Sequence, residues 1–309
     1  MKIEDLQYEL PTQQVDAKDF DLEKWRKECP MDYLKAMYIL NKEEGFNKDA
    51  AFNVIYQVTR QYIPDVLYKY YSLTNDEIMN EKKLESLREC KIFMADTKNF
   101  NDPFDGKAYF YDANQLKKFD RLAKYDGKMI DDFTSFIKVT SLTENNENSM
   151  PMWAHYANNH AGFCVSYDMK NNVQLSSCTF PIQYCTQRID VTSLMEKQAQ
   201  MISDEIEKQS IKGERQIRMD DLSMLYMTLL FCNLKHSSWS YENEFRCTTG
   251  ATAKGMPYID AKPKEIFIGM NCSSEYSKRL TEIANALKVP IHRMAFEETA
   301  AQFDLSVVE

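Results

Sequence analysis

Two glutamates, Glu242 and Glu244, stand two residues apart in the stretch WSYENEFR, which covers residues 239–246. If residues 241–248 form a β-strand, its period of two places both carboxylates and Arg246 on one face. Such a face is either the wall of a polar cleft or an ordinary solvated edge, since exposed strands often carry charge ladders. In a cleft, one carboxylate can stabilise a developing positive charge while the other removes a proton from an attacking group.

A second polar and aromatic group occurs in the turn-rich segment NDPFDG, at residues 101–106. Asn and Asp side chains bond their own backbone in turns, Pro fixes φ, and Gly closes the turn. Asn101 and Asp102 are expected at a polar rim, which Phe100 and Phe104 anchor. Loops of this kind line binding sites, but they also serve as plain structural turns.

A third group lies in MPMWAHYANNHAGFC, at residues 150–164. Trp153 and Tyr156 share one face of a short predicted helix, where they could stack on a bound aromatic ring or pack into the core. His155 and His160 could act as ligands or bases. Because no third ligand stands at a metal-like spacing, the sequence favours structural or surface roles for both histidines.

The elements that must position these residues alternate irregularly between strands and helices, which predicts an α+β fold rather than a regular parallel α/β fold. Pro64 separates a polar arm and helical cap (1–63) from one predicted α+β domain (64–309). Strands are expected at 66–73, 92–95, 133–143, 163–167, within 173–184, and at 265–269 and 291–296, and helices at 107–129, 193–209, 220–234 and 274–287.

Composition restricts the class of protein. The 309 residues carry a net charge of -9, which disfavours non-specific binding to a phosphate backbone. Eight cysteines occur without any Cys-x-x-Cys pair, as expected for reduced thiols of a cytoplasmic protein. The chain shows no signal peptide and no apolar stretch of membrane-spanning length, so we expect no association with a membrane.

Four segments together resemble a widespread, little-characterised bacterial domain family that is often associated with phage-defence and mobile loci. They are LYKYYSL, FNDPFD, SLTENNENSMPMWAHYANNHAGFCVSYD and WSYENEFR, and the resemblance extends over residues 66–272.

The order of these segments also resembles, more weakly, the layout of mono-ADP-ribosyltransferases, which implies an ADP-ribosyltransferase-like mixed sheet with the helical cap as an N-terminal extension. The resemblance implies that Lys69 on a first strand holds NAD, that Ser141 lies on a second strand, and that Glu244 is catalytic. Glu242 falls where the acceptor-activating residue belongs. The chain has Lys69 where Arg or His is usual, and Leu142-Thr143 after the serine in place of a Ser-Thr-Ser. The full set of residues expected to contact NAD is Tyr68, Lys69, Tyr70, Asn101, Asp102, Ser141, Trp153, Tyr156 and Arg246.

The resulting hypothesis is an NAD-consuming enzyme, either a toxin or an antiviral defence effector, with NAD as substrate and no metal. Its acceptor would be a protein or a nucleic acid. One alternative is a Mg²⁺-dependent nuclease whose ligands are Asp102, Asp105, Glu242 and Glu244. Another is a non-catalytic sensor, in which the cleft binds a nucleotide or a protein and the helical cap contacts a partner protein.

Overall fold

The computed structural model describes residues 63–96, 100–128, 137–212, 232–250 and 258–299, together with 301, 303 and 305–308. The predicted arm and helical cap therefore lie outside the described residues, apart from Ile63, and so does most of the helix predicted at 220–234. The chain divides into two compact units. Unit 1 includes Asp96–Ile137 and Gln183–Trp239, whereas unit 2 consists of Thr59–Ala95, Lys138–Ile182 and Ser240–Glu309.

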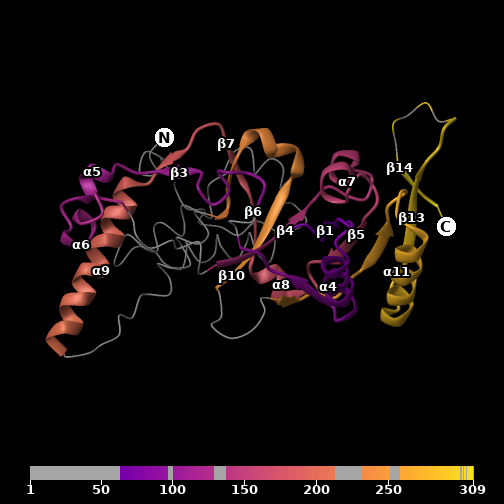
Figure 1. Ribbon diagram of the computed structural model, residues 1–309, viewed down its shortest axis with the longest axis horizontal. Coiled ribbons are helices and arrows are strands. Elements are labelled where there is room, and N and C mark those ends of the chain that lie inside the picture. Colours follow the sequence, from indigo (N-terminus) through magenta and orange to yellow (C-terminus); the bar gives the residue numbers. More distant parts are fainter. Residues whose placement is uncertain are drawn as a thin grey trace, which may run out of the picture. The chain divides into compact units, whose positions relative to one another are not determined.

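An eight-stranded mixed sheet dominates unit 2, with the order β14-β13-β12-β5-β1-β4-β10-β6 (Figure 1). β1 pairs antiparallel with both β4 and β5, and β12 pairs parallel with β13. Helices accompany this sheet, so the predicted α+β class is confirmed. The strands are β1 (Val66–Tyr71), β4 (Ile137–Thr143), β5 (Phe163–Asp168), β6 (Thr179–Pro181), β10 (Glu244–Gly250), β12 (Glu265–Ile268), β13 (Ile291–Phe296) and β14 (Leu305–Val308).

β1 occupies an inner position because its sequence, VLYKYY, consists of aromatic and aliphatic residues around one lysine. Tyr68 lies opposite Thr143 on β4 and opposite Ser166 on β5. Strand alternation turns Tyr68 and Tyr70 toward one face of the sheet and Lys69 toward the other. The three consecutive residues that were predicted to hold NAD are thus divided between two faces.

Helix α7 (Met150–Tyr156) packs on the face of the sheet that carries Tyr70. The core there includes Trp153 and Met152 from α7 together with Phe267 from β12. Gly162 allows the close approach of the chain after α7, since a Cβ at this position would overlap the backbone carbonyl of Tyr71.

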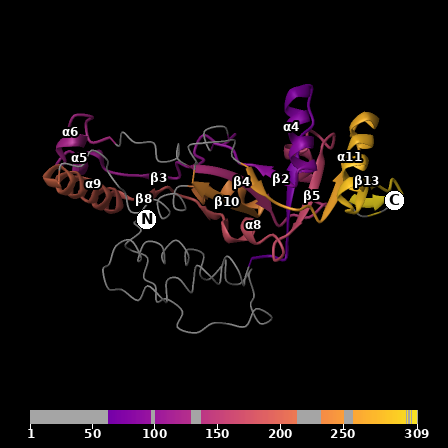
Figure 2. The ribbon, with the colours of Figure 1, turned by 90° about the horizontal axis from the view of Figure 1, so that it is seen from below.

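Helices α4 (Glu77–Arg88) and α11 (Ser274–Leu287) rise next to each other from the sheet (Figure 2). Asp76 caps α4 by accepting a hydrogen bond from the Met79 amide, and Ser273 caps α11 in the same way. The buried Asn80 amide donates to the Tyr276 hydroxyl at 2.9 Å and so joins the two helices. The predicted bounds of α11 and β13 are confirmed.

Two further strands in unit 2, β2 (Lys91–Phe93) and β11 (Tyr258–Asp260), form a separate two-stranded antiparallel sheet. Helix α8 (Val173–Ser177) contacts β11. The strand predicted within 173–184 is present as β6, and α8 occupies the first part of that range. Ser176 and Thr179 side chains bond backbone carbonyls within this helical turn.

Unit 1 contains two small parallel pairs, β3 (Tyr109–Phe110) with β8 (Ile189–Asp190), and β7 (Gln183–Cys185) with β9 (Leu234–His236). Its longest described helix is α9 (Thr192–Lys212). The single helix predicted at 107–129 was wrong, since two short helices, α5 (Ala113–Leu116) and α6 (Asp120–Ala123), are found there. Phe119 has an extended backbone, which separates them.

Candidate functional site

The acidic strand that motivated the site hypothesis carries a buried ion pair. Arg246 Nε lies 2.7 Å from Glu244 Oε1, and a second guanidinium nitrogen lies 3.2 Å from Oε2. The two side chains are only 1% and 4% exposed, respectively. Bidentate geometry fixes the plane of the carboxylate, and burial makes the pair sensitive to loss of either partner. The alternative of a solvated strand edge is therefore wrong.

Glu242 does not belong to that strand, contrary to the prediction of one strand over residues 241–248. The 3₁₀ helix η6 (Ser237–Glu242) ends at it, and β10 begins at Glu244. Between them, Asn243 adopts a left-handed backbone with φ 43°. Asn tolerates this conformation better than most residues, which explains the break in the strand.

The carboxylate of Glu242 is nevertheless buried in the same unit, with the residue only 3% exposed. It accepts a hydrogen bond from the hydroxyl of Tyr156 on α7. Burial raises the pKa of the Tyr156 phenol, and the hydrogen bond and the negative charge of Glu242 raise it further. Tyr156 is therefore a neutral donor at physiological pH, and it ties α7 to the acidic turn.

Lys69 contributes a positive group from β1. Its ammonium donates to the backbone carbonyl of Ser141 on β4 at 3.0 Å. Burial lowers the pKa of Lys69 to about 8, although the negative charge of Glu244 opposes this shift. Lys69, Ser141 and Glu244 thus come from three strands that are neighbours in the sheet, and they lie close enough for direct or electrostatic interaction.

The predicted aromatic residues mostly support the loop that follows β4. Tyr70 donates its hydroxyl to the Asn146 carbonyl, and the Trp153 indole donates to the Glu147 carbonyl at 2.6 Å. Burial, together with the charge of Glu147, raises the pKa of Tyr68. Trp153 has no exposed surface and packs edge-on against Tyr70, so it does not present a free ring to a ligand in this structure.

The two histidines near α7 have surroundings that fit the structural roles favoured by the sequence. His155 is exposed and its ring lies 6.1 Å from that of Tyr241. His160 stacks against Trp153, and burial lowers its pKa. Within the described ranges, no group of three or more His, Cys, Asp or Glu side chains could hold a metal ion.

Asn101 and Asp102 belong to unit 1. Asn101 is exposed, whereas Asp102 is only 9% exposed. Asp102 Oδ1 accepts a hydrogen bond from the Phe104 amide at 2.9 Å, as the predicted turn requires. The turn in NDPFDG is therefore present, and the predicted contact of these two residues with NAD stays a prediction.

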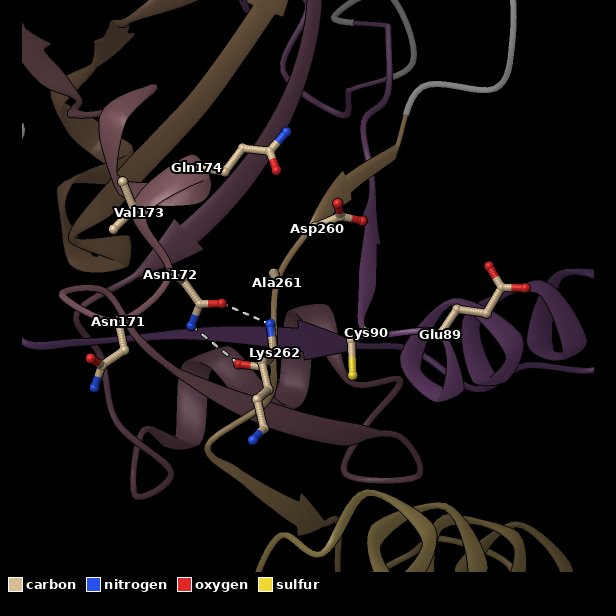
Figure 3. Close-up of a pocket in the computed structure, with 9 residues that line it drawn as sticks. All are labelled: Glu89, Cys90, Asn171, Asn172, Val173, Gln174, Asp260, Ala261 and Lys262. Atoms are coloured by element: carbon tan, nitrogen blue, oxygen red, sulfur yellow. Dashed lines mark hydrogen bonds between the residues drawn. The ribbon is translucent and has the colours of Figure 1, made fainter.

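A separate open pocket of about 340 Å³ lies between α8, β11 and the end of α4 (Figure 3). Asn172 holds one wall, because its side-chain amide exchanges two hydrogen bonds with the backbone of Lys262. None of the predicted site residues is among those that line it, which are Glu89, Cys90, Asn171, Asn172, Val173, Gln174, Asp260, Ala261 and Lys262.

The sequence did not single out the loop that holds Glu242 in place. Thr143 donates its hydroxyl to the Glu242 carbonyl at 2.5 Å and accepts from the Asn145 amide at 2.9 Å. The Asn145 side chain then donates to the Tyr241 carbonyl at 2.7 Å. Polar residues directly after a strand were a usable signal, but their partners about 100 positions later were not visible in the sequence.

No helix among the described residues has the length and apolar character needed to cross a membrane. Comparison with curated proteins and with solved structures finds no match. Residues 152–247, which run from α7 to the start of β10, match the model of one family, described as a protein of unknown function (DUF2971). The match supports the predicted resemblance to a little-characterised domain family.

Proposed function

We propose that unit 2 carries the active site of an NAD-consuming enzyme of the ADP-ribosyltransferase type. One observation carries the proposal: Lys69, Ser141 and Glu244, far apart in sequence, lie on the adjacent strands β1, β4 and β10. The Lys69 ammonium donates a hydrogen bond to the Ser141 main-chain carbonyl and interacts electrostatically with the Glu244 carboxylate. The resemblance to ADP-ribosyltransferases leads us to expect these three positions near one another, and the sequence order alone does not bring them together; the contact with Lys69 is made by the Ser141 main-chain carbonyl.

Glu244 has the chemistry needed for the first step. When nicotinamide leaves NAD, the ribose develops the positive charge of an oxocarbenium ion, and a fixed carboxylate can stabilise that charge. Two guanidinium nitrogens of Arg246 bond the two carboxylate oxygens of Glu244, at 2.7 and 3.2 Å, and so fix the orientation of the carboxylate. A carboxylate that is already oriented needs no reorganisation as the bond to nicotinamide breaks.

Glu242 is placed to serve the second step. Its carboxylate lies two residues before Glu244, beyond the turn at Asn243, and it accepts a hydrogen bond from Tyr156. A carboxylate can remove the proton from an attacking group, which contributes roughly 10²–10⁴-fold to a rate. Such an enzyme would deplete NAD or modify an acceptor, and either outcome suits a toxin or a defence effector.

The burial of both carboxylates favours a second candidate, a non-catalytic module that senses a nucleotide or a protein. Glu242 and Glu244 are each 3% exposed, and each already has a charged or hydroxyl partner. NAD must displace covering groups before its ribose can contact either carboxylate. In a sensor, the same polar network would only stabilise the fold or report on binding.

The decisive experiment measures NAD consumption by the purified full chain and by Glu244→Gln, in the presence and absence of EDTA. Gln keeps the shape of the side chain and removes its charge, so we expect turnover to fall by on the order of 10²-fold while NAD affinity changes little. Glu265→Gln is the matched control, because Glu265 also lies on a strand of this sheet but is 30% exposed. The control should keep wild-type turnover.

Other outcomes separate the alternatives. Wild-type protein that neither binds nor consumes NAD, with protein and nucleic-acid acceptors supplied, would refute the enzyme proposal. Binding without turnover would identify a sensor. Cleavage of nucleic acid that EDTA abolishes, with NAD left intact, would identify the Mg²⁺-dependent nuclease.

A further inference from the structure

The turn that carries Glu242 is held by a dense set of hydrogen bonds from the loop after β4. The Asn145 side chain donates to the Tyr241 carbonyl at 2.7 Å and accepts from the Asn243 side chain at 2.9 Å. The Glu144 amide donates to the Asn243 carbonyl at 3.1 Å. Asn145 therefore contacts the residues on both sides of Glu242.

The carboxylate itself is held from another direction. Tyr156, at the end of α7, donates its hydroxyl to Glu242 Oε1. α7 is in turn fixed by the core, because Trp153 is fully buried and Met152 is 6% exposed. The backbone of Glu242 is thus oriented by the loop after β4, and its side chain is oriented by α7.

We infer that Asn145 and Tyr156 are positioning residues for Glu242, which they hold in the orientation needed to activate the acceptor. The inference rests on the proposed transferase function. It gives Tyr156 a role other than stacking on NAD, since the tyrosine would act through the glutamate. It also adds Asn145, which the resemblance does not include among the functional residues.

This arrangement predicts which part of the reaction each residue affects. Loss of the Tyr156 hydroxyl removes a hydrogen bond that orients the Glu242 carboxylate, so proton removal from an acceptor becomes less efficient. Loss of the Asn145 side chain removes the hydrogen bonds that hold the backbone on either side of Glu242. Proton removal from an acceptor should therefore become less efficient in this variant too. Tyr156 bonds the carboxylate of Glu242 and Asn145 bonds its neighbours, whereas Arg246 orients Glu244, so the ratio of ADP-ribosyl transfer to NAD hydrolysis should fall.

The test is a double-mutant cycle that measures the ratio of ADP-ribosyl transfer to NAD hydrolysis. Two acceptors are supplied: the small guanidine compound agmatine, and the protein itself. Tyr156→Phe and Asn145→Ala should each lower the ratio of transfer to hydrolysis about tenfold, within the range lost when general-base catalysis is impaired. Because Tyr156 acts through Glu242, the double variant Glu242→Gln/Tyr156→Phe should show no lower ratio than Glu242→Gln alone.

Two matched controls test the specificity of the effect. Asn146→Ala alters the neighbouring residue of the same loop, whose exposed side chain bonds only within the loop among its described contacts. Tyr71→Phe removes another tyrosine hydroxyl, which pairs with Tyr167 at 3.2 Å on the other face of β1. Both controls should keep the wild-type ratio.

Several results would overturn the inference. Independent, multiplying effects of Tyr156→Phe and Glu242→Gln would show that the tyrosine does not act through the glutamate. An Asn145→Ala variant that behaves like Asn146→Ala would exclude the role of Asn145. A wild type that hydrolyses NAD but labels neither acceptor would also overturn it, with the proposed NAD chemistry intact. A wild type that consumes no NAD would refute the proposed function and this inference together.

Discussion

The Glu244–Arg246 pair offers the sharpest test of the buried polar site, through replacement of Arg246 by Met. The side chains are 4% and 1% exposed, and the guanidinium makes two hydrogen bonds to the carboxylate. Met fills a similar volume but leaves the carboxylate charged and without this partner in a site that water reaches poorly. Breaking a buried pair from one side costs about 3–5 kcal/mol. We expect Arg246→Met to lower the free energy of unfolding by that amount.

Urea denaturation followed by tryptophan fluorescence measures this loss, because Trp153 lies in the core of the same unit. Glu244→Leu combined with Arg246→Met removes both charges, so the double variant should be more stable than Arg246→Met alone. Arg279→Met is the matched control, since its partner Glu81 is 56% exposed, and it should change stability far less.

A loss below about 1 kcal/mol for Arg246→Met, or one equal to that of Arg279→Met, would refute the reasoning. It would mean that water reaches the carboxylate and that the pair behaves as a surface pair. Arg246 would then not hold Glu244 in one orientation, whatever the activity of the protein.

Two further predictions concern the surroundings of this pair. The folded-state pKa of Lys69, about 8, lies below the value for an unfolded chain, so the unfolded state binds more protons above that pH. The free energy of unfolding of the wild type, relative to that of Lys69→Met, should therefore rise as the pH increases from about 8 to about 10. Denaturation at several pH values measures this difference. A difference that does not change with pH would mean that the lysine is solvated. Asn243→Ala should lower the free energy of unfolding by about 1–2 kcal/mol, because alanine disfavours the left-handed backbone and cannot make the side-chain hydrogen bond to Asn145. Asn243→Gly should lower it less, because glycine adopts this backbone readily. Equal losses of stability in thermal denaturation would contradict this account.

Local sequence patterns predicted much of unit 2, because the spacing of apolar residues in its helices and strands matches the period of each element. The amphipathic pattern at 274–287 predicted α11 with its correct bounds, and the structure adds the Ser273 cap and the buried positions Leu280, Ile283 and Ala284. The prediction failed where one residue changed the backbone. Asn243 interrupts the expected strand, and Phe119 separates two helices that looked like one.

The site was harder to predict than the fold because its geometry depends on long-range contacts. The spacing of Glu242 and Glu244 indicated paired carboxylates, but a polar strand looks the same whether it is solvated or buried. Arg246 is buried because β10 lies between β4 and β6 in the sheet. The order of the strands cannot be read from a local sequence pattern. The resemblance suggested that Lys69, Ser141 and Glu244 belong together, whereas the hydrogen bonds between Asn145 and the turn at Glu242 became visible only in the structure.

The strand order has a consequence for how the protein is made on the ribosome. β1, β4 and β5 become available early, but β10 cannot pair with β4 until translation has passed residue 250. Until then β10 is not paired with β4, and Glu244 is missing from the nascent sheet. A product that ends before residue 242 therefore lacks any activity that depends on the carboxylates of Glu242 and Glu244. Under the proposed function, chains that are still being translated would therefore consume no NAD.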